Sequence, residues 1–145
     1  MLRYANLEDL KALCEIESEL FNENNFPLSR ESFRYHIKHK AIFVYEKDSN
    51  PVGSVLVLFR TNSKTARIYS LGIKNAFQGL GIAKILFEKA LLHVKENGKD
   101  FAKLEVRVDN QKAIKMYEKY GFTCKRVLKE YYLDKCDGLE MFKTL

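Results

Sequence analysis

Residues 104–122 constrain the fold of this chain more than any other segment, because a strand pattern there passes directly into a helix pattern. Residues 101–108 alternate apolar and polar side chains, as a half-buried strand does. Asn110 has the residue type of a helix N-cap, and Gly121 is suited to end a helix that runs to Tyr120. The sequence therefore predicts a strand followed at once by a short helix.

A second strand and helix lie upstream, with two glycines between them. Residues 66–73 have a strand pattern, and residues 81–97 carry the wide apolar face of a helix. Glycines before a helix N-terminus let its free amides approach a phosphate, although Gly79 and Gly81 also fit a plain tight turn. A dinucleotide-binding fingerprint is rejected because Lys84 replaces its third glycine, and a Walker-type loop lacks its G-K-[ST] ending.

The rest of the chain adds a hairpin, two helices and closing strands. Residues 41–45 and 52–59 are expected to form the hairpin, with 55–59 in a central strand because every residue there is apolar. Helices are expected after Asn6 and Ser29, and strands at 122–132 and 139–142. The sequence predicts an α/β to α+β fold, a mixed sheet of about six to seven strands flanked by about four helices. Its length favours a single domain, 1–145.

Composition limits the cellular setting more than the function. The first residues lack the apolar stretch of a signal peptide, and no apolar run approaches about 18 residues, so we expect a cytoplasmic protein that does not bind membranes. Cys14, Cys124 and Cys136 show no metal-site spacing and are expected to be free thiols. The net charge of +6 is compatible with a phosphorylated partner, but the lysines are scattered and identify none.

Two motifs together resemble a known family. Gln78, Gly81 and Ala83 fit the pattern R/Q-x-x-G-x-G/A at a strand-to-helix loop, and residues 104–122 supply the second motif. The chain resembles the acetyl-coenzyme A-dependent N-acetyltransferases of the GNAT superfamily, and most closely the branch that acetylates the N-terminal alanine of a ribosomal protein. This resemblance implies acetyl-CoA as co-substrate, no metal, and direct acetyl transfer to an amine.

The resemblance also implies where acetyl-CoA binds. The pyrophosphate would contact backbone amides of the glycine loop, and the pantetheine arm would lie along the preceding strand. A further asparagine would help hold the coenzyme while it caps the helix. The implied cofactor-binding residues are Leu71, Ile73, Gln78, Gly79, Leu80, Gly81, Ile82, Ala83 and Asn110.

Close relatives place a general base and a general acid where this chain has Glu105 and Tyr117. Spacing alone also fits a surface glutamate paired with lysine and a tyrosine in the core. An ordinary carboxylate is a weak base for an amine, so we expect Glu105 to act through water or with raised basicity.

The acceptor is expected to be the α-amine of a protein N-terminus, and a ribosomal protein is the favoured acceptor. Deprotonating an α-amine at neutral pH costs roughly 3 kcal/mol less than deprotonating lysine. The resemblance assigns the acceptor site to Phe26, Pro27, Leu28, Tyr131 and Tyr132. Relatives often have tryptophan at Leu28 and a longer ending than 137–141, so the first-residue preference stays open.

Two other functions stay open. The first is an acetyltransferase for a small amine, such as an amino sugar, amino acid or polyamine, and the second is a non-catalytic basic module that binds RNA or the ribosome. We expect no DNA binding, and a monomer or homodimer. His36 and His39 lack a third metal ligand, and Cys124 lacks a nearby histidine that would activate it as a nucleophile.

Overall fold

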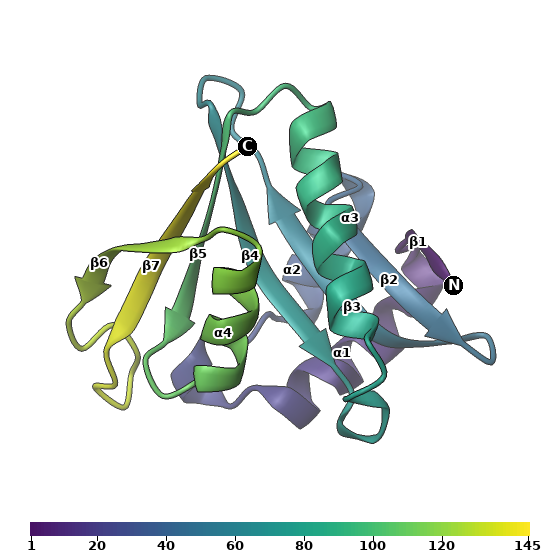
Figure 1. Ribbon diagram of the computed structural model, residues 1–145. Coiled ribbons are helices and arrows are strands. Elements are labelled where there is room, and N and C mark those ends of the chain that lie inside the picture. The colour runs from purple at the N-terminus through teal and green to yellow at the C-terminus, as the bar shows by residue number, and fades with distance from the viewer.

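The computed structural model describes residues 1–145 as a seven-stranded sheet in the order β1-β2-β3-β4-β5-β7-β6 (Figure 1). Only β4 and β5 are parallel, and every other neighbouring pair is antiparallel. The strands are β1 (Leu2–Tyr4), β2 (Ile42–Lys47), β3 (Asn50–Leu58), β4 (Thr65–Ile73), β5 (Phe101–Arg107), β6 (Thr123–Leu128) and β7 (Gly138–Thr144). The expected mixed sheet is confirmed.

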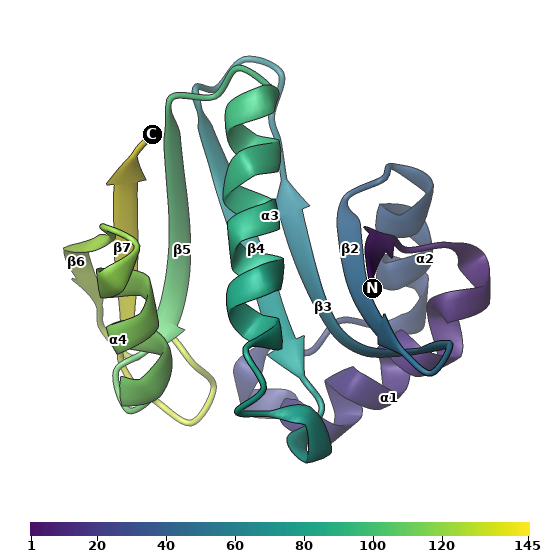
Figure 2. The same ribbon diagram turned by 45° about the vertical axis from the view of Figure 1, so that its right-hand side comes forward.

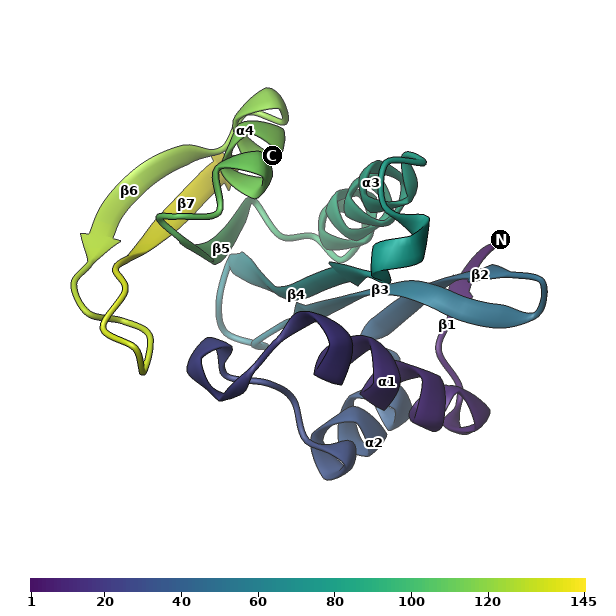
Figure 3. The same cartoon turned by 90° about the horizontal axis from the view of Figure 1, so that it is seen from below.

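Four helices cover the two faces of the sheet, as expected. They are α1 (Leu10–Leu20), α2 (Arg30–Lys38), α3 (Ile82–Glu96) and α4 (Gln111–Lys119). Helices α1 and α2 lie on one face and α3 and α4 on the other (Figure 3). Each face has its own hydrophobic core, and the core under α3 is the larger. Asn6 and Ser29 accept backbone hydrogen bonds as N-caps, at the two helix starts that the sequence indicated.

The hairpin of β2 and β3 is tighter than expected. Asp48 and Ser49 both have positive φ and form the turn, so pairing extends to Lys47 and Asn50. Strand β3 is central, between β2 and β4, and Val55 and Val57 are completely buried. Phe59, expected in this strand, lies beyond its end and is exposed.

Three sequence-based expectations need correction. The strand expected at 122–132 ends at Leu128, because the following loop needs left-handed backbone at Glu130 and Lys135. Strand β1 was not expected, since three residues are too few to show an alternating pattern. Ile85, expected on the buried face of α3, is exposed beside the fully buried Leu86.

The parallel pair β4 and β5 separates along its length. Only Thr65–Arg67 pairs with Phe101–Lys103, and beyond these residues the strands diverge towards their carboxyl ends (Figure 2). Carboxyl ends of parallel strands are a common place for ligand sites in α/β folds. No helix here combines the length and the apolar character that crossing a membrane requires.

Candidate functional site

A groove of about 230 Å³ opens where β4 and β5 diverge. Its walls come from α1, the loop after α1, both diverging strands, α4 and the loop between β6 and β7. The walls carry aromatic rings together with two glutamates and two arginines. The lining residues are Glu17, Leu20, Phe21, Asn25, Phe26, Arg67, Ile68, Tyr69, Ser70, Leu71, Leu104, Glu105, Val106, Arg107, Asn110, Tyr117, Tyr131 and Tyr132.

Glu105 lies in this groove as half of an ion pair. Alternation along β5 buries Leu104 and Val106 and turns Glu105 to the other face. Its Oε2 accepts a hydrogen bond from Nε of Arg67 on β4 at 3.2 Å, and its Oε1 lies 2.8 Å from Nη2 of the same guanidinium. The partner is thus an arginine across the diverging strands, not the surface lysine that spacing alone allowed.

Tyr117 reaches the groove from α4. Its ring packs against Phe87 of α3 and Phe122, with centroids 5.2 Å and 6.3 Å away. Every fully enclosed side-chain oxygen of the chain has a hydrogen-bond partner. The Tyr117 hydroxyl has no partner within the protein, so it is not fully enclosed and is accessible from the groove that Tyr117 lines. Loss of hydration raises the pKa of Tyr117 to about 12, which keeps the phenol protonated at neutral pH.

Three aromatic residues of the expected acceptor site come together. Phe26 contacts Tyr131 edge-on at 5.5 Å and Tyr132 at 5.7 Å between ring centroids. Phe26 is 37% exposed and Tyr132 only 8%, so the cluster presents some rings to the groove and buries others. Pro27 and Leu28 do not line the groove, and Leu28 packs against the core under α1 and α2.

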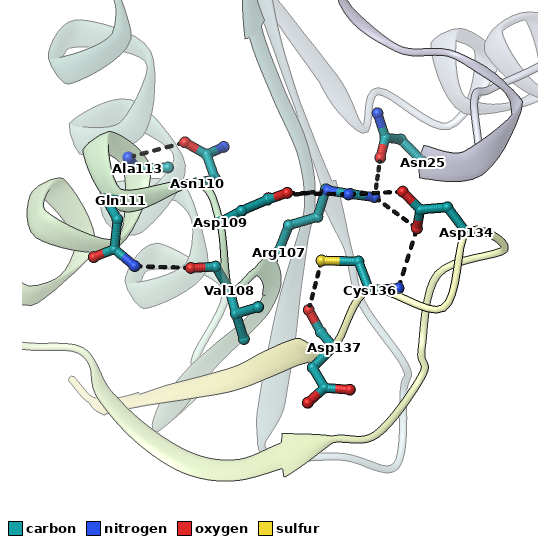
Figure 4. Close-up of polar contacts among 10 residues, drawn as sticks. All are labelled: Asn25, Arg107, Val108, Asp109, Asn110, Gln111, Ala113, Asp134, Cys136 and Asp137. Atoms are coloured by element: carbon teal, nitrogen blue, oxygen red, sulfur yellow. Dashed lines mark hydrogen bonds and ion pairs between the residues drawn. The ribbon is translucent and has the colours of Figure 1, made fainter.

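Arg107 fastens the two loops that carry these rings. Its guanidinium donates hydrogen bonds to Asp109, to Asp134 and to the side-chain oxygen of Asn25, as Figure 4 shows. It also lies 5.0 Å from the centre of the Tyr132 ring. The Asp134 and Asp109 hydrogen bonds raise the pKa of Arg107 above its usual range. One charged side chain at the end of β5 therefore ties the loop after α1 to the loop after β6.

The outer edge of β4 faces the groove along the expected pantetheine path. The amide of Lys74 bonds the carbonyl of Val52 on β3, so in the alternating ladder Leu71 and Ile73 direct their backbone groups away from β3, towards the gap. The Ile73 carbonyl there accepts a hydrogen bond from the side chain of Gln78 at 3.0 Å. Gln78 thus fixes the turn out of β4.

The glycine loop leads into α3 with left-handed backbone at Gly79 and Gly81, where φ is +81° and +82°. An added Cβ at either residue would meet nothing within 4 Å, so glycine is required here by backbone conformation and the space beside it is open. Gly81 is the N-cap of α3 without a side-chain cap, which leaves first-turn amides, including those of Ile82 and Ala83, free for a phosphate. Leu80 is exposed beside them.

Asn110 caps α4, as its residue type predicted. Its side-chain oxygen accepts a hydrogen bond from the amide of Ala113 at 3.3 Å (Figure 4). It also lines the groove, next to the end of β5. The cap holds the start of α4, and thereby the helix that carries Tyr117, against the diverging strands.

Glu17, Arg67 and Tyr69 are among the groove residues that the sequence did not identify as site residues. Glu17 is 8% exposed and accepts a hydrogen bond from the amide of Leu28 at 2.8 Å. Burial raises the pKa of Glu17, and that hydrogen bond opposes the rise in part. Burial also raises the pKa of Tyr69, and the charges of Glu17 and Glu105 add to it. The available signal was that Glu17 follows Leu10 and Leu13 on the apolar stripe of α1.

Comparisons with known proteins agree with this geometry. The model of the acetyltransferase (GNAT) family matches residues 10–122. The chain is 30% identical to a putative [ribosomal protein bS18]-alanine N-acetyltransferase of Bacillus subtilis, across 99% of this chain and 95% of the relative. It is also 30% identical to an N-alpha-acetyltransferase of Sulfurisphaera tokodaii, across 99% of this chain and 92% of that protein.

Solved structures match the fold over nearly all of the chain. Ard1 from Thermoplasma volcanium has a TM-score of 0.91 at 23% identity and covers 100% of this chain and 97% of its own. The ribosomal-protein-S18-alanine N-acetyltransferase from Escherichia coli has a TM-score of 0.86 at 21% identity, over 99% and 92%. The putative acetyltransferase yncA from Salmonella typhimurium, with its cofactor acetyl-CoA, has a TM-score of 0.86 at 17% identity, over 100% and 93%.

Proposed function

Since the chain belongs to the acetyltransferase (GNAT) family and is an acetyl-CoA-dependent N-acetyltransferase, we propose that its acceptor is the α-amine of a protein N-terminus. One observation carries the proposal: the groove between β4 and β5 is walled by aromatic rings and contains both Glu105 and Tyr117. An open groove of this shape suits an extended chain end. The relatives from Bacillus subtilis and Sulfurisphaera tokodaii carry names of N-terminal acetyltransferases, which supports the same acceptor class.

The glycine loop fits the pyrophosphate of the co-substrate. Gly79 and Gly81 leave open space beside the backbone, and the N-terminus of α3 offers unpaired amides and a partial positive charge. Leu71 and Ile73 offer backbone groups at the free edge of β4 for an amide-containing arm. The acetyl thioester supplies an activated carbonyl, and this path would bring it to the groove.

Glu105 and Tyr117 would handle the two protons of the reaction. The attacking amine forms a C–N bond while the C–S bond breaks, so the nitrogen must lose a proton and the thiolate must gain one. Glu105, held in position by Arg67, would accept the proton of the amine directly or through water. Tyr117, with its protonated hydroxyl open to the groove, would donate to the thiolate.

Short peptides test the acceptor class. The purified protein is mixed with acetyl-CoA and peptides that have a free or a blocked N-terminus, some with an internal lysine, and products are measured by mass spectrometry. We expect acetylation only of free N-termini. Products on lysine alone would move the activity to side chains, and no peptide product despite coenzyme A binding would favour a small-molecule amine.

A ribosomal protein is the acceptor that we favour within this class. The support is the Bacillus subtilis relative, whose name specifies the alanine N-terminus of a ribosomal protein. Peptides that differ only in their first residue test this preference, with alanine expected to give the highest kcat/KM. A uniform rate across first residues, or a strong preference for methionine, would contradict it.

A further inference from the structure

One charged side chain in the groove has no partner of opposite charge. Arg67 is paired with Glu105, and Arg107 is shared by Asp109 and Asp134. Glu17 forms no ion pair, although it is almost completely buried. Its charge is therefore the one that the protein itself leaves uncompensated at this site.

The geometry of Glu17 also leaves one oxygen free. Oε1 accepts the amide hydrogen of Leu28 at 2.8 Å, and Oε2 has no hydrogen bond. Every fully enclosed side-chain oxygen of the chain has a hydrogen-bond partner, so the unpaired Oε2 must be accessible. Glu17 lines the groove. A ligand in the groove can reach this oxygen.

The chemistry of this oxygen selects its ligand. A carboxylate removed from water without a cation is unfavourable, so the group that completes the site should be cationic and should donate hydrogen bonds. A protein N-terminus, with a pKa of about 8, arrives at neutral pH mainly as an ammonium ion. The rings of Phe26, Tyr69 and Tyr131 line the same groove, and exclusion of water by these rings and a bound ligand would strengthen such a pair.

We propose that Glu17 binds the α-ammonium group of the incoming acceptor through the oxygen that Leu28 leaves free. This inference rests on the proposed function, since it specifies how that acceptor is held. Glu17 is then an acceptor-binding residue. Glu105, which lines the same groove, remains the proposed proton acceptor.

Binding of two matched peptides tests the proposal without turnover. Calorimetry with coenzyme A present compares a short peptide that has an N-terminal alanine with the same peptide in which hydrogen replaces the amino group. Wild-type protein should bind the amine peptide about tenfold more tightly or better, as expected for a hydrogen bond to a charged group. Glu17→Gln keeps an oxygen for the Leu28 amide but loses the charge, and should abolish this preference.

A matched control removes a charge from the same helix. Glu15→Gln acts on the exposed side of α1, outside the groove, and should keep the wild-type preference. In turnover, Glu17→Gln should raise KM for the peptide about tenfold with little change in kcat. A failure of the proposed function can be distinguished from a failure of this inference, because in that case the wild-type enzyme would not acetylate the peptide at all.

Several results would overturn the inference. The first is a wild-type protein that binds both peptides equally well. The second is a Glu17→Gln variant that keeps the preference for the amine peptide. The third is a Glu17→Gln variant whose affinity falls equally for both peptides, as expected if Glu17 is purely structural. If Glu17→Gln does not fold, Glu17→Asp replaces it. Its charge is retained but withdrawn by one methylene, so the preference should fall below that of the wild type, and an unchanged preference would equally refute the proposal.

Discussion

The environments of Glu105 and Tyr117 suit opposite proton-transfer roles. Arg67 fixes the position of the Glu105 carboxylate through one hydrogen bond and an ion-pair contact of 2.8 Å. Burial of the Tyr117 hydroxyl favours the neutral phenol. A positioned carboxylate and a phenol with a raised pKa thus lie in one groove, and such a pair suits a proton acceptor and a proton donor.

Replacement of Glu105 tests its proposed role as proton acceptor. Glu105→Gln should lower kcat about 10²- to 10⁴-fold, the usual contribution of a positioned acid or base, with KM for acetyl-CoA almost unchanged. Steady-state kinetics with a peptide acceptor measure both values. Glu118→Gln, an exposed carboxylate of α4 outside the groove, is the control. Equal kcat values for the two variants would exclude Glu105 as the base.

Tyr117→Phe should separate chemistry from packing. The ring contacts with Phe87 and Phe122 remain, so the melting temperature should stay close to that of the wild type while kcat falls about 100-fold. Because the pKa of Tyr117 is about 12, the wild-type kcat should show no loss from its ionisation up to mildly alkaline pH. Tyr120→Phe is the control, since its hydroxyl bonds Glu88 outside the groove. A similar kcat for both variants would remove Tyr117 from the mechanism.

Helix α3 is built to leave its N-terminus open. The side-chain caps that begin α2 and α4 are replaced at α3 by Gly81, with left-handed backbone and no side chain over the first amides. Gln78 holds the preceding turn to the end of β4. The loop thus gives up a stabilising cap, and its free amides are available to an anion.

Gly81→Ala should weaken coenzyme A binding beyond its cost in stability. A Cβ in left-handed backbone costs about 1–2 kcal/mol, and relief of this strain would turn the amides away from the phosphate. Calorimetry should show a Kd for coenzyme A raised about tenfold or more, which is about 1.4 kcal/mol. Gly98→Ala is a close control, because Gly98 also has positive φ and open space but lies at the far end of α3. If both variants bind coenzyme A equally well, the loop is not the pyrophosphate site.

A charged cluster joins β1, at the edge of the sheet, to the segment that leads into α1. Arg3 of β1 donates to both oxygens of Asp9, at 2.7 Å and 2.8 Å, and to Glu46 of β2 at 3.0 Å. Asp9 also accepts the amide of Asn6 in a capping box before α1. The edge strand and the α1 layer are thus held together by one nearly buried carboxylate.

This cluster predicts a specific acid dependence of stability. Burial alone would raise the pKa of Asp9, but the hydrogen bonds from Arg3 and Asn6 lower it overall. A lowered native pKa means that Asp9 stabilises the fold above its unfolded pKa of about 3.9, and that this contribution is lost as the pH falls further. Asp9→Asn should therefore cost about 1–3 kcal/mol at neutral pH and progressively less below about pH 4.

Denaturant unfolding of both proteins from pH 7 to about pH 3 measures this difference. The raised pKa of Glu17 acts in the opposite direction, since an acid with a raised native pKa favours folding at low pH. It is present in both proteins and cancels in the comparison. A difference in unfolding free energy that does not vary with pH would show that the Asp9 charge does not contribute.

Local patterns were sufficient for most of the fold. The alternation at 101–108, the apolar run at 55–57 and the caps Asn6, Ser29 and Asn110 act within a few residues, so each was visible in the sequence. The missed element, β1, pairs with β2 about forty residues away, and no local pattern records such a pairing. The loop after β6 was mistaken for strand because its left-handed residues are not glycines.

The candidate site shows the same contrast between local sequence patterns and long-range contacts. Local sequence patterns predicted the glycine loop and the fold class, because backbone conformation and periodicity are properties of neighbouring residues. The proposal of Glu105 and Tyr117 as catalytic residues came from the resemblance to a family. Three features of the site depend on contacts between distant segments: Arg67 pairs with Glu105, Arg107 ties two loops together, and Glu17 lies buried in the groove with one oxygen free. These contacts join segments from 11 to 82 positions apart in the chain, and their energies arise only when packing brings the charges together and removes the water between them.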